Sequence, residues 1–184
     1  MIVVCGLMII VTAGLLLSLT SKEFYYAMSS EKIELQGKVR TIAEWIEKDV
    51  RQAISWDIAN NAPLPTYLKF RQVSDWDNVN HAITLSSDYF EYQYDAANKK
   101  IVRRQLDSAG VVIKTWEFGN VEKKDDPLYA PFYTRNNAGA VVAMNGDDLR
   151  TSRKVIVKIS GAKLVRGNLT LSSVLDAEVK IRNE

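Results

Sequence analysis

Residues 1–19 read MIVVCGLMIIVTAGLLLSL, and no charged residue precedes Lys22. At about 1.5 Å of rise per residue, a helix over this stretch is about 28 Å long, close to the hydrocarbon thickness of a bilayer. A cleaved secretory signal needs a basic start, a shorter apolar core and a small-residue cleavage site, and the stretch shows none of these convincingly. We therefore predict a retained transmembrane segment over residues 1–21. Its apolar side chains include Ile2, Val3, Val4, Leu7, Ile9, Ile10, Leu15, Leu16 and Leu17.

A second apolar pattern continues from this segment without a proline. Six apolar side chains recur three or four residues apart, the spacing of one helix face, and are predicted to pack on a sheet. They are Leu35, Val39, Ile42, Ile46, Val50 and Ile54. The charged residues between them, Asp49 included, are predicted to form a solvated face. Because the prolines at 63 and 65 disfavour helix before them, residues 22–61 are predicted to be the amphipathic half of one helix that ends near Asn60.

Composition limits the size and class of the region after the helix. The chain has 184 residues, of which 47% are hydrophobic, so residues 62–184 have room for one modest globular domain. The formal net charge of +2 and the scattered basic residues do not indicate a nucleic-acid partner. The single cysteine, Cys5, excludes an intrachain disulfide within this sequence.

Beyond Pro65 the apolar pattern alternates or is continuous, which is typical of β-strands. Residues 89–94 and 101–104, joined by a short loop, predict a hairpin, and residues 111–118 extend it to a three-stranded meander. An antiparallel sheet needs a cover on one face, and the helix stripe supplies one. We therefore predict an α+β fold with the long N-terminal helix packed on an antiparallel sheet. The predicted strands are 67–73, 82–86, 89–94, 101–106, 111–118, 140–144, 154–160 and 169–182.

Candidates for chemistry are sparse. The only histidine, His81, has no neighbouring sequence pattern of a catalytic triad, so the chain is not predicted to be an enzyme. Two groups of oxygen ligands are weak candidates for calcium, although turn chemistry explains them better and no cofactor is predicted. These candidates are Asp75, Asp77, Asn145, Asp147 and Asp148.

Four segments share patterns with one family. Residues 1–11 are similar to the apolar segment that comes after a Phe-Thr-Leu-Ile-Glu start, and residues 46–53 are similar to an acidic-x-Arg-Gln-Ala run. Residues 90–104 resemble a Tyr-x-Tyr, turn, Arg strand pair, and residues 179–183 resemble a closing strand. On these segments the chain resembles the type IV pilin superfamily, especially its minor pilins and the J-type minor pseudopilin of type II secretion.

The resemblance implies a pilin-like roll and a structural role. Such a subunit waits in the inner membrane with its domain in the periplasm, then packs its apolar helix in the core of a hetero-oligomeric filament, for a J-type subunit near the tip. Its partners would be other pilin or pseudopilin subunits and an inner-membrane assembly platform. An alternative class, a signal-anchored extracytoplasmic sensor or binding domain, shares the membrane span, whereas an anchored hydrolase lacks a catalytic constellation.

Two features of the family are missing from the sequence: the glycine at the processing site and the acidic fifth residue of the mature subunit. We expect the leader and the first mature residues to lie upstream of Met1, with an uncleaved relative as the alternative.

Overall fold

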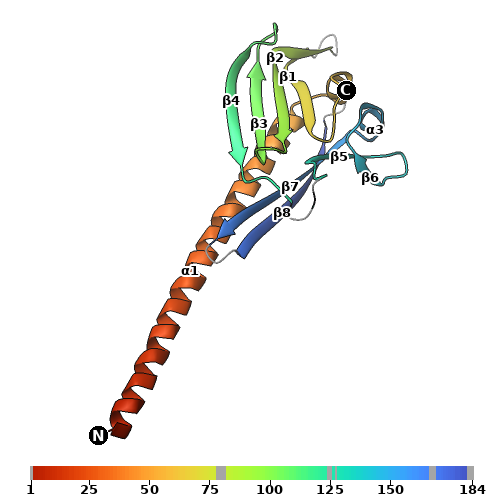
Figure 1. Ribbon diagram of the computed structural model, residues 1–184. Helices are drawn as coiled ribbons and strands as arrows, with labels where there is room; N and C mark the ends of the chain where they lie inside the picture. The colour runs from red at the N-terminus through yellow and green to blue at the C-terminus, as the bar shows by residue number, and fades with distance from the viewer. Residues whose placement is uncertain (1, 78–81, 124–125, 127, 166–168, 182–184) are drawn as a thin grey trace.

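One long helix carries two antiparallel four-stranded sheets, which makes the protein an α+β structure as predicted. The computed structural model describes residues 2–77, 82–123, 126, 128–165 and 169–181. The N-terminal half of helix α1 (Ile2–Arg51) projects away from both sheets, and its C-terminal half lies against them (Figure 1). The start of α1 therefore lies far from both sheets.

The first sheet contains the predicted hairpin and meander. Its strands follow the chain in the order β1-β2-β3-β4, each antiparallel to the next. They are β1 (Tyr67–Asp77), β2 (Ala82–Asp95), β3 (Lys100–Leu106) and β4 (Val112–Gly119). The strands predicted separately over 82–86 and 89–94 are one strand. Its register with β1 shifts on both sides of Val73, and residues 86–88 of β2, which span the gap between the two predicted strands, lie at the larger of these irregularities.

A second sheet, in the order β6-β5-β7-β8, replaces the single predicted sheet. Its strands are β5 (Phe132–Arg135), β6 (Val141–Ala143), β7 (Lys154–Val165) and β8 (Leu169–Lys180). Strand β5 lies between the predicted strands 111–118 and 140–144, where the sequence predicted no strand. Four residues give little periodic signal, and Phe132 pairs with Val157 far along the chain.

Helix α1 ends at Arg51. The sequence predicted that it would continue to about Asn60, and this prediction is wrong. Ala53 then forms a β-bridge with Gln72, and a second helix, α2 (Ser55–Asn60), comes next. The backbone amide of Val73 donates to the carbonyl of Gln52 at 2.8 Å. Pairing with the start of the first sheet therefore overrides local helix propensity at residues 52–54.

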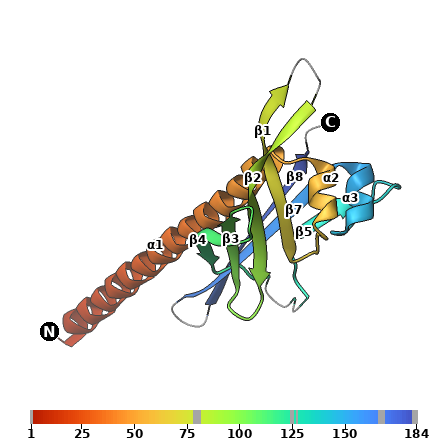
Figure 2. The ribbon, with the colours of Figure 1, turned by 90° about the horizontal axis from the view of Figure 1, so that it is seen from above.

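All six stripe residues are buried, with exposed fractions of 2% or less. Five lie on α1, while Ile54 is buried from the extended segment after it. The helix approaches β7 closely at Gly161, where an added Cβ would lie 2.7 Å from Cγ2 of Val39. In Figure 2, β7 and β8 pass beneath the first sheet and alongside α1. The core therefore lies where the helix meets both sheets.

Candidate assembly surface on the long helix

The projecting half of α1 exposes apolar side chains around the whole helix. Leu15, Leu16 and Leu17, which are consecutive and so point in different directions, are 58–69% exposed. A helix that is apolar on all sides requires an apolar environment around it. The other exposed large apolar residues of this half are Met8, Ile10, Val11, Leu19, Phe24, Tyr25 and Tyr26.

Five of the predicted membrane-segment side chains lie outside the described residues: Ile2, Val3, Val4, Leu7 and Ile9. Across the part of the chain that the structure describes, no helix has the length and mean hydropathy required of a membrane span.

Asp49 joins the buried half of α1 to the first sheet. It is 7% exposed, whereas the sequence predicted that it would lie on the solvated face of the helix. Its Oδ2 accepts hydrogen bonds from the Tyr92 hydroxyl at 2.6 Å and from Arg103 Nε at 2.7 Å. Its Oδ1 accepts one from Gln72 Nε2 at 3.1 Å. The three donors come from β1, β2 and β3, so one carboxylate ties the helix to three strands.

The Tyr92 hydroxyl is a permanent donor in this network. Burial, and then the neighbouring Asp49 carboxylate, raise the pKa of Tyr92 well above its usual value. The hydroxyl therefore stays protonated, and Arg103 supplies the positive charge that balances Asp49.

Aromatic rings surround the Arg103 guanidinium. Its Cζ lies 4.2 Å from the ring centroid of Trp116, 4.7 Å from that of Phe90 and 5.3 Å from that of Trp45. Cation–π attraction adds to the ion pair here, because the rings also exclude water. A cavity of about 400 Å³ opens beside this group and is lined by Trp45, Lys48, Asp49, Phe90, Arg103, Gln105 and Trp116.

The sequence did not identify the Asp49–Tyr92–Arg103 network, although one signal was available. Arg103 is two residues from Ile101 on β3, so both side chains point to the same face, and Ile101 is fully buried. A charged residue on a buried face needs a partner. Nothing in the sequence shows that the partner is 54 positions away.

Two of the calcium candidates, Asn145 and Asp148, interact with each other at the start of a helix. Asn145 caps helix α3 (Gly146–Ser152): its Oδ1 accepts from the backbone amide of Asp148 at 2.9 Å, and its Nδ2 donates to the Asp148 carboxylate at 2.8 Å. Asp147 is exposed in the first turn, and Asp75 lies in β1. Among the described residues no cluster of His, Cys, Asp and Glu could hold a metal ion. The side chain of Asp77, and His81 entirely, lie outside those residues.

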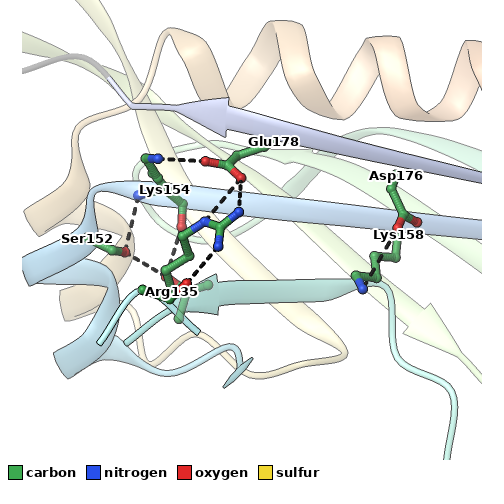
Figure 3. Close-up of polar contacts among 8 residues, drawn as sticks. Arg135, Ser152, Lys154, Lys158, Asp176 and Glu178 are labelled. Atoms are coloured by element: carbon green, nitrogen blue, oxygen red, sulfur yellow. Dashed lines mark hydrogen bonds and ion pairs between the residues drawn. The ribbon is translucent and has the colours of Figure 1, made fainter. Parts of the chain in front are cut away.

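Ion pairs cross the outer face of the second sheet (Figure 3). Arg135 on β5 donates from Nη2 to Glu178 Oε2 on β8 at 2.6 Å, and Lys154 on β7 lies 2.7 Å from Glu178 Oε1. Lys158 and Asp176 form a longer pair at 3.8 Å. Hydrogen bonds from Arg135, and then from Lys154, lower the pKa of Glu178 from 4.5 to about 2.

This lowered pKa predicts an acid-sensitive contribution to stability. Because the folded-state pKa of Glu178 is below its unfolded value, its contribution is complete above about pH 4.5 and is lost as the pH falls toward about 2. Glu178→Gln is expected to lower the free energy of unfolding at neutral pH by up to about 1 kcal/mol, since solvent screens the pairs. Urea unfolding of both proteins across this pH range tests it. A difference that does not change with pH would contradict the prediction.

A scan against known protein families, a search of curated proteins and a search of solved structures found no match to this chain.

Proposed function

We propose that the protein is a structural subunit of a pilin-like filament, either a minor pilin of a type IV pilus or a minor pseudopilin of type II secretion. One observation carries the proposal: a single 50-residue helix exposes apolar side chains along its first half and forms the core of an α+β domain with its second half. In this view the two sheets and the buried half of α1 form the pilin-like roll.

The projecting half of α1 suits two successive environments. As a single-pass anchor in the inner membrane it lies among lipid tails, with the domain in the periplasm. In a filament core the same side chains lie among helices of neighbouring subunits. Both environments are apolar, so the transfer loses little hydrophobic stabilisation, and packing between helices selects the neighbours.

The continuity of α1 favours a filament subunit over an anchored sensor. A sensor needs only a tether between membrane and domain. Here there is no helix break between the exposed Leu16 and the buried Leu35, so the domain is held in a fixed direction relative to the apolar segment. A fixed direction is what repeated packing of identical or related subunits requires.

The proposal predicts that a charge at Leu16 disrupts both environments. Leu16→Asp is expected to lower the share of full-length protein in the membrane fraction, since an acidic residue costs about 2.5–3.5 kcal/mol at the centre of a membrane helix and less toward its end, where Leu16 lies. Ile113→Asp is the matched control, because Ile113 on β4 is 56% exposed against 58% for Leu16. Fractionation of cells that express each protein measures the effect.

A second readout separates a filament subunit from a sensor. A photo-crosslinking amino acid at position 16 is expected to form adducts with pilin-like subunits, identified by mass spectrometry, in membranes and in sheared filaments. The same group at position 113 serves as the reference for crosslinking from the domain surface. A protein that stays in the membrane but forms adducts only with lipid would overturn the filament proposal and favour the sensor.

A further inference from the structure

The cavity beside Arg103 contains hydrogen-bond donors that the fold does not use. A guanidinium carries one N–H group on Nε and four on its two Nη nitrogens. Nε of Arg103 donates to Asp49 Oδ2 at 2.7 Å and lies 3.0 Å from the Tyr92 hydroxyl oxygen. Within the described part of the chain, neither Nη1 nor Nη2 donates a hydrogen bond. Most of the donors of this cation are therefore left without an acceptor.

These unused donors can be reached from the cavity. Arg103 is one of the residues that line it, and neither Nη nitrogen is fully enclosed by protein atoms. The side chain as a whole is nevertheless buried, with 8% of its surface exposed. Buried polar groups normally have a partner, and hydrogen bonds between a guanidinium and an oxyanion are among the strongest in proteins. The position of Arg103 therefore indicates a ligand that brings acceptor oxygens.

The charge of the cavity lining favours an anion. Its charged residues are two cations, Arg103 and Lys48, and one carboxylate, Asp49, whose two oxygens already accept hydrogen bonds. Lys48 forms no ion pair with another described residue. The acidic residues nearest to it on α1, Glu44 and Glu47, pair with arginines instead. One positive charge of the lining is therefore left for a ligand to balance.

Three aromatic side chains, Trp45, Phe90 and Trp116, form the apolar walls of the cavity. The ring centroids of Trp45 and Trp116 lie 6.0 Å apart, and their planes make an angle of 68°, so the two rings are walls of one corner. The volume of about 400 Å³ lies in the range of small-molecule sites, which combine apolar walls with a few polar groups. The walls are therefore suited to a ring, and the cations to its charge.

We propose that this cavity binds a carboxylate carried on a flat ring, with the ring against Trp45 and Trp116 and the carboxylate between Arg103 and Lys48. The carboxylate supplies the acceptors that Arg103 lacks and balances the charge of Lys48. The ring replaces water on the apolar faces of the tryptophans. Aromatic acids and acidic sugars share this chemistry, since one face of a sugar ring presents C–H groups. The inference does not depend on the membrane anchor or on the filament.

The test uses the full chain in nonionic detergent, with 5-fluorotryptophan at its four tryptophan positions. Phenylacetate and glucuronate are the two probes. The fluorine signals of Trp45 and Trp116, assigned with Trp→Phe variants, are expected to shift and to saturate during titration. Trp56 is the internal control, because it is 38% exposed, like Trp45, but does not line the cavity.

Three further compounds separate the contributions of ring and charge. Acetate lacks the ring, whereas phenylacetamide and glucose keep a ring and lack the charge. All three are expected to bind at least about tenfold more weakly than the better probe, since each loses either the apolar contact or a charge-assisted hydrogen bond.

Lys48→Met tests the protein side of the same contact. It is expected to weaken binding of the better probe by about tenfold, because the carboxylate loses one of its two cations. Lys32→Met is the matched control, since Lys32 is also exposed on α1 and lies outside the cavity. An unchanged Trp56 signal shows that either variant has kept its fold.

Saturable shifts at Trp45 and Trp116 with either probe support the proposal, and the tighter probe identifies the source of the ring. The absence of such shifts with both probes overturns it. Equal binding of acetate would show a simple anion site, and equal binding of the uncharged compounds or an unchanged affinity of Lys48→Met would show an apolar pocket. Each of these results also overturns the proposal, as does a shift of the same size at Trp56, which shows a nonspecific effect.

Discussion

Asp49→Ala is expected to lower the free energy of unfolding by about 3–5 kcal/mol, because removing one partner of a buried ion pair leaves the other charge unpaired. Arg103 is 7% exposed, surrounded by aromatic rings, and would lose its 2.7 Å contact to the carboxylate. The Tyr92 hydroxyl and the Gln72 amide would lose their acceptor as well. Urea unfolding of the full chain in detergent, followed by tryptophan fluorescence, measures the loss.

Glu47→Ala is the matched control for this variant. Glu47 lies two positions before Asp49 on the same helix and pairs with Arg51 at the surface, where an ion pair contributes about 0.2–1 kcal/mol. Tyr92→Phe should fall between the two, with a loss of about 1–3 kcal/mol for an unmade hydrogen bond. Equal losses for Asp49→Ala and Glu47→Ala would show that the buried network adds no more than a surface pair.

Ile46→Ala is expected to cost about 2–5 kcal/mol, the range for truncating a buried aliphatic side chain to alanine. Ile46 is fully buried on α1 in the core that the helix forms with both sheets. The surrounding side chains come from separate elements and can only partly close the cavity, so we expect a loss in the upper half of this range. The same urea measurement applies, with the slope of the transition checked to be unchanged.

Ile33→Ala provides the comparison, since it makes the same chemical change on the same helix. Ile33 is 69% exposed, and its truncation should alter the free energy of unfolding by no more than about 0.5 kcal/mol. If the two variants lost similar amounts, the face of α1 that carries Ile46 would not be the main contact between helix and domain.

The parts of the fold that depend on local periodicity could be predicted from the sequence. The helix stripe from Leu35 to Val50 and the hairpin of β2 and β3 each repeat a side-chain pattern within a short window. The helix break after Arg51 could not be predicted in this way. Ile54 continues the spacing of the stripe although its backbone is extended, and the bridge from Ala53 to Gln72 is a tertiary contact.

The second sheet and the buried ion pair show the same limit. Strand β5 is too short to show a period, and it is defined by pairing with β7 and β6. Asp49 lies among charged residues that are exposed, and only its position opposite Arg103 makes it buried. Pairings between distant segments are determined by how the whole chain packs, so a single sequence window does not contain them.

The close approach at Gly161 has a mechanical consequence. Because Leu35 and Val39 pack against the backbone of β7 there, and Asp49 is bonded further along to three strands of the first sheet, contacts between α1 and the domain extend over several helical turns. A pull on the apolar end along the helix axis therefore loads these contacts together, in shear, and does not peel them apart one at a time. The domain cannot be detached from its stalk under tension without loss of its own core.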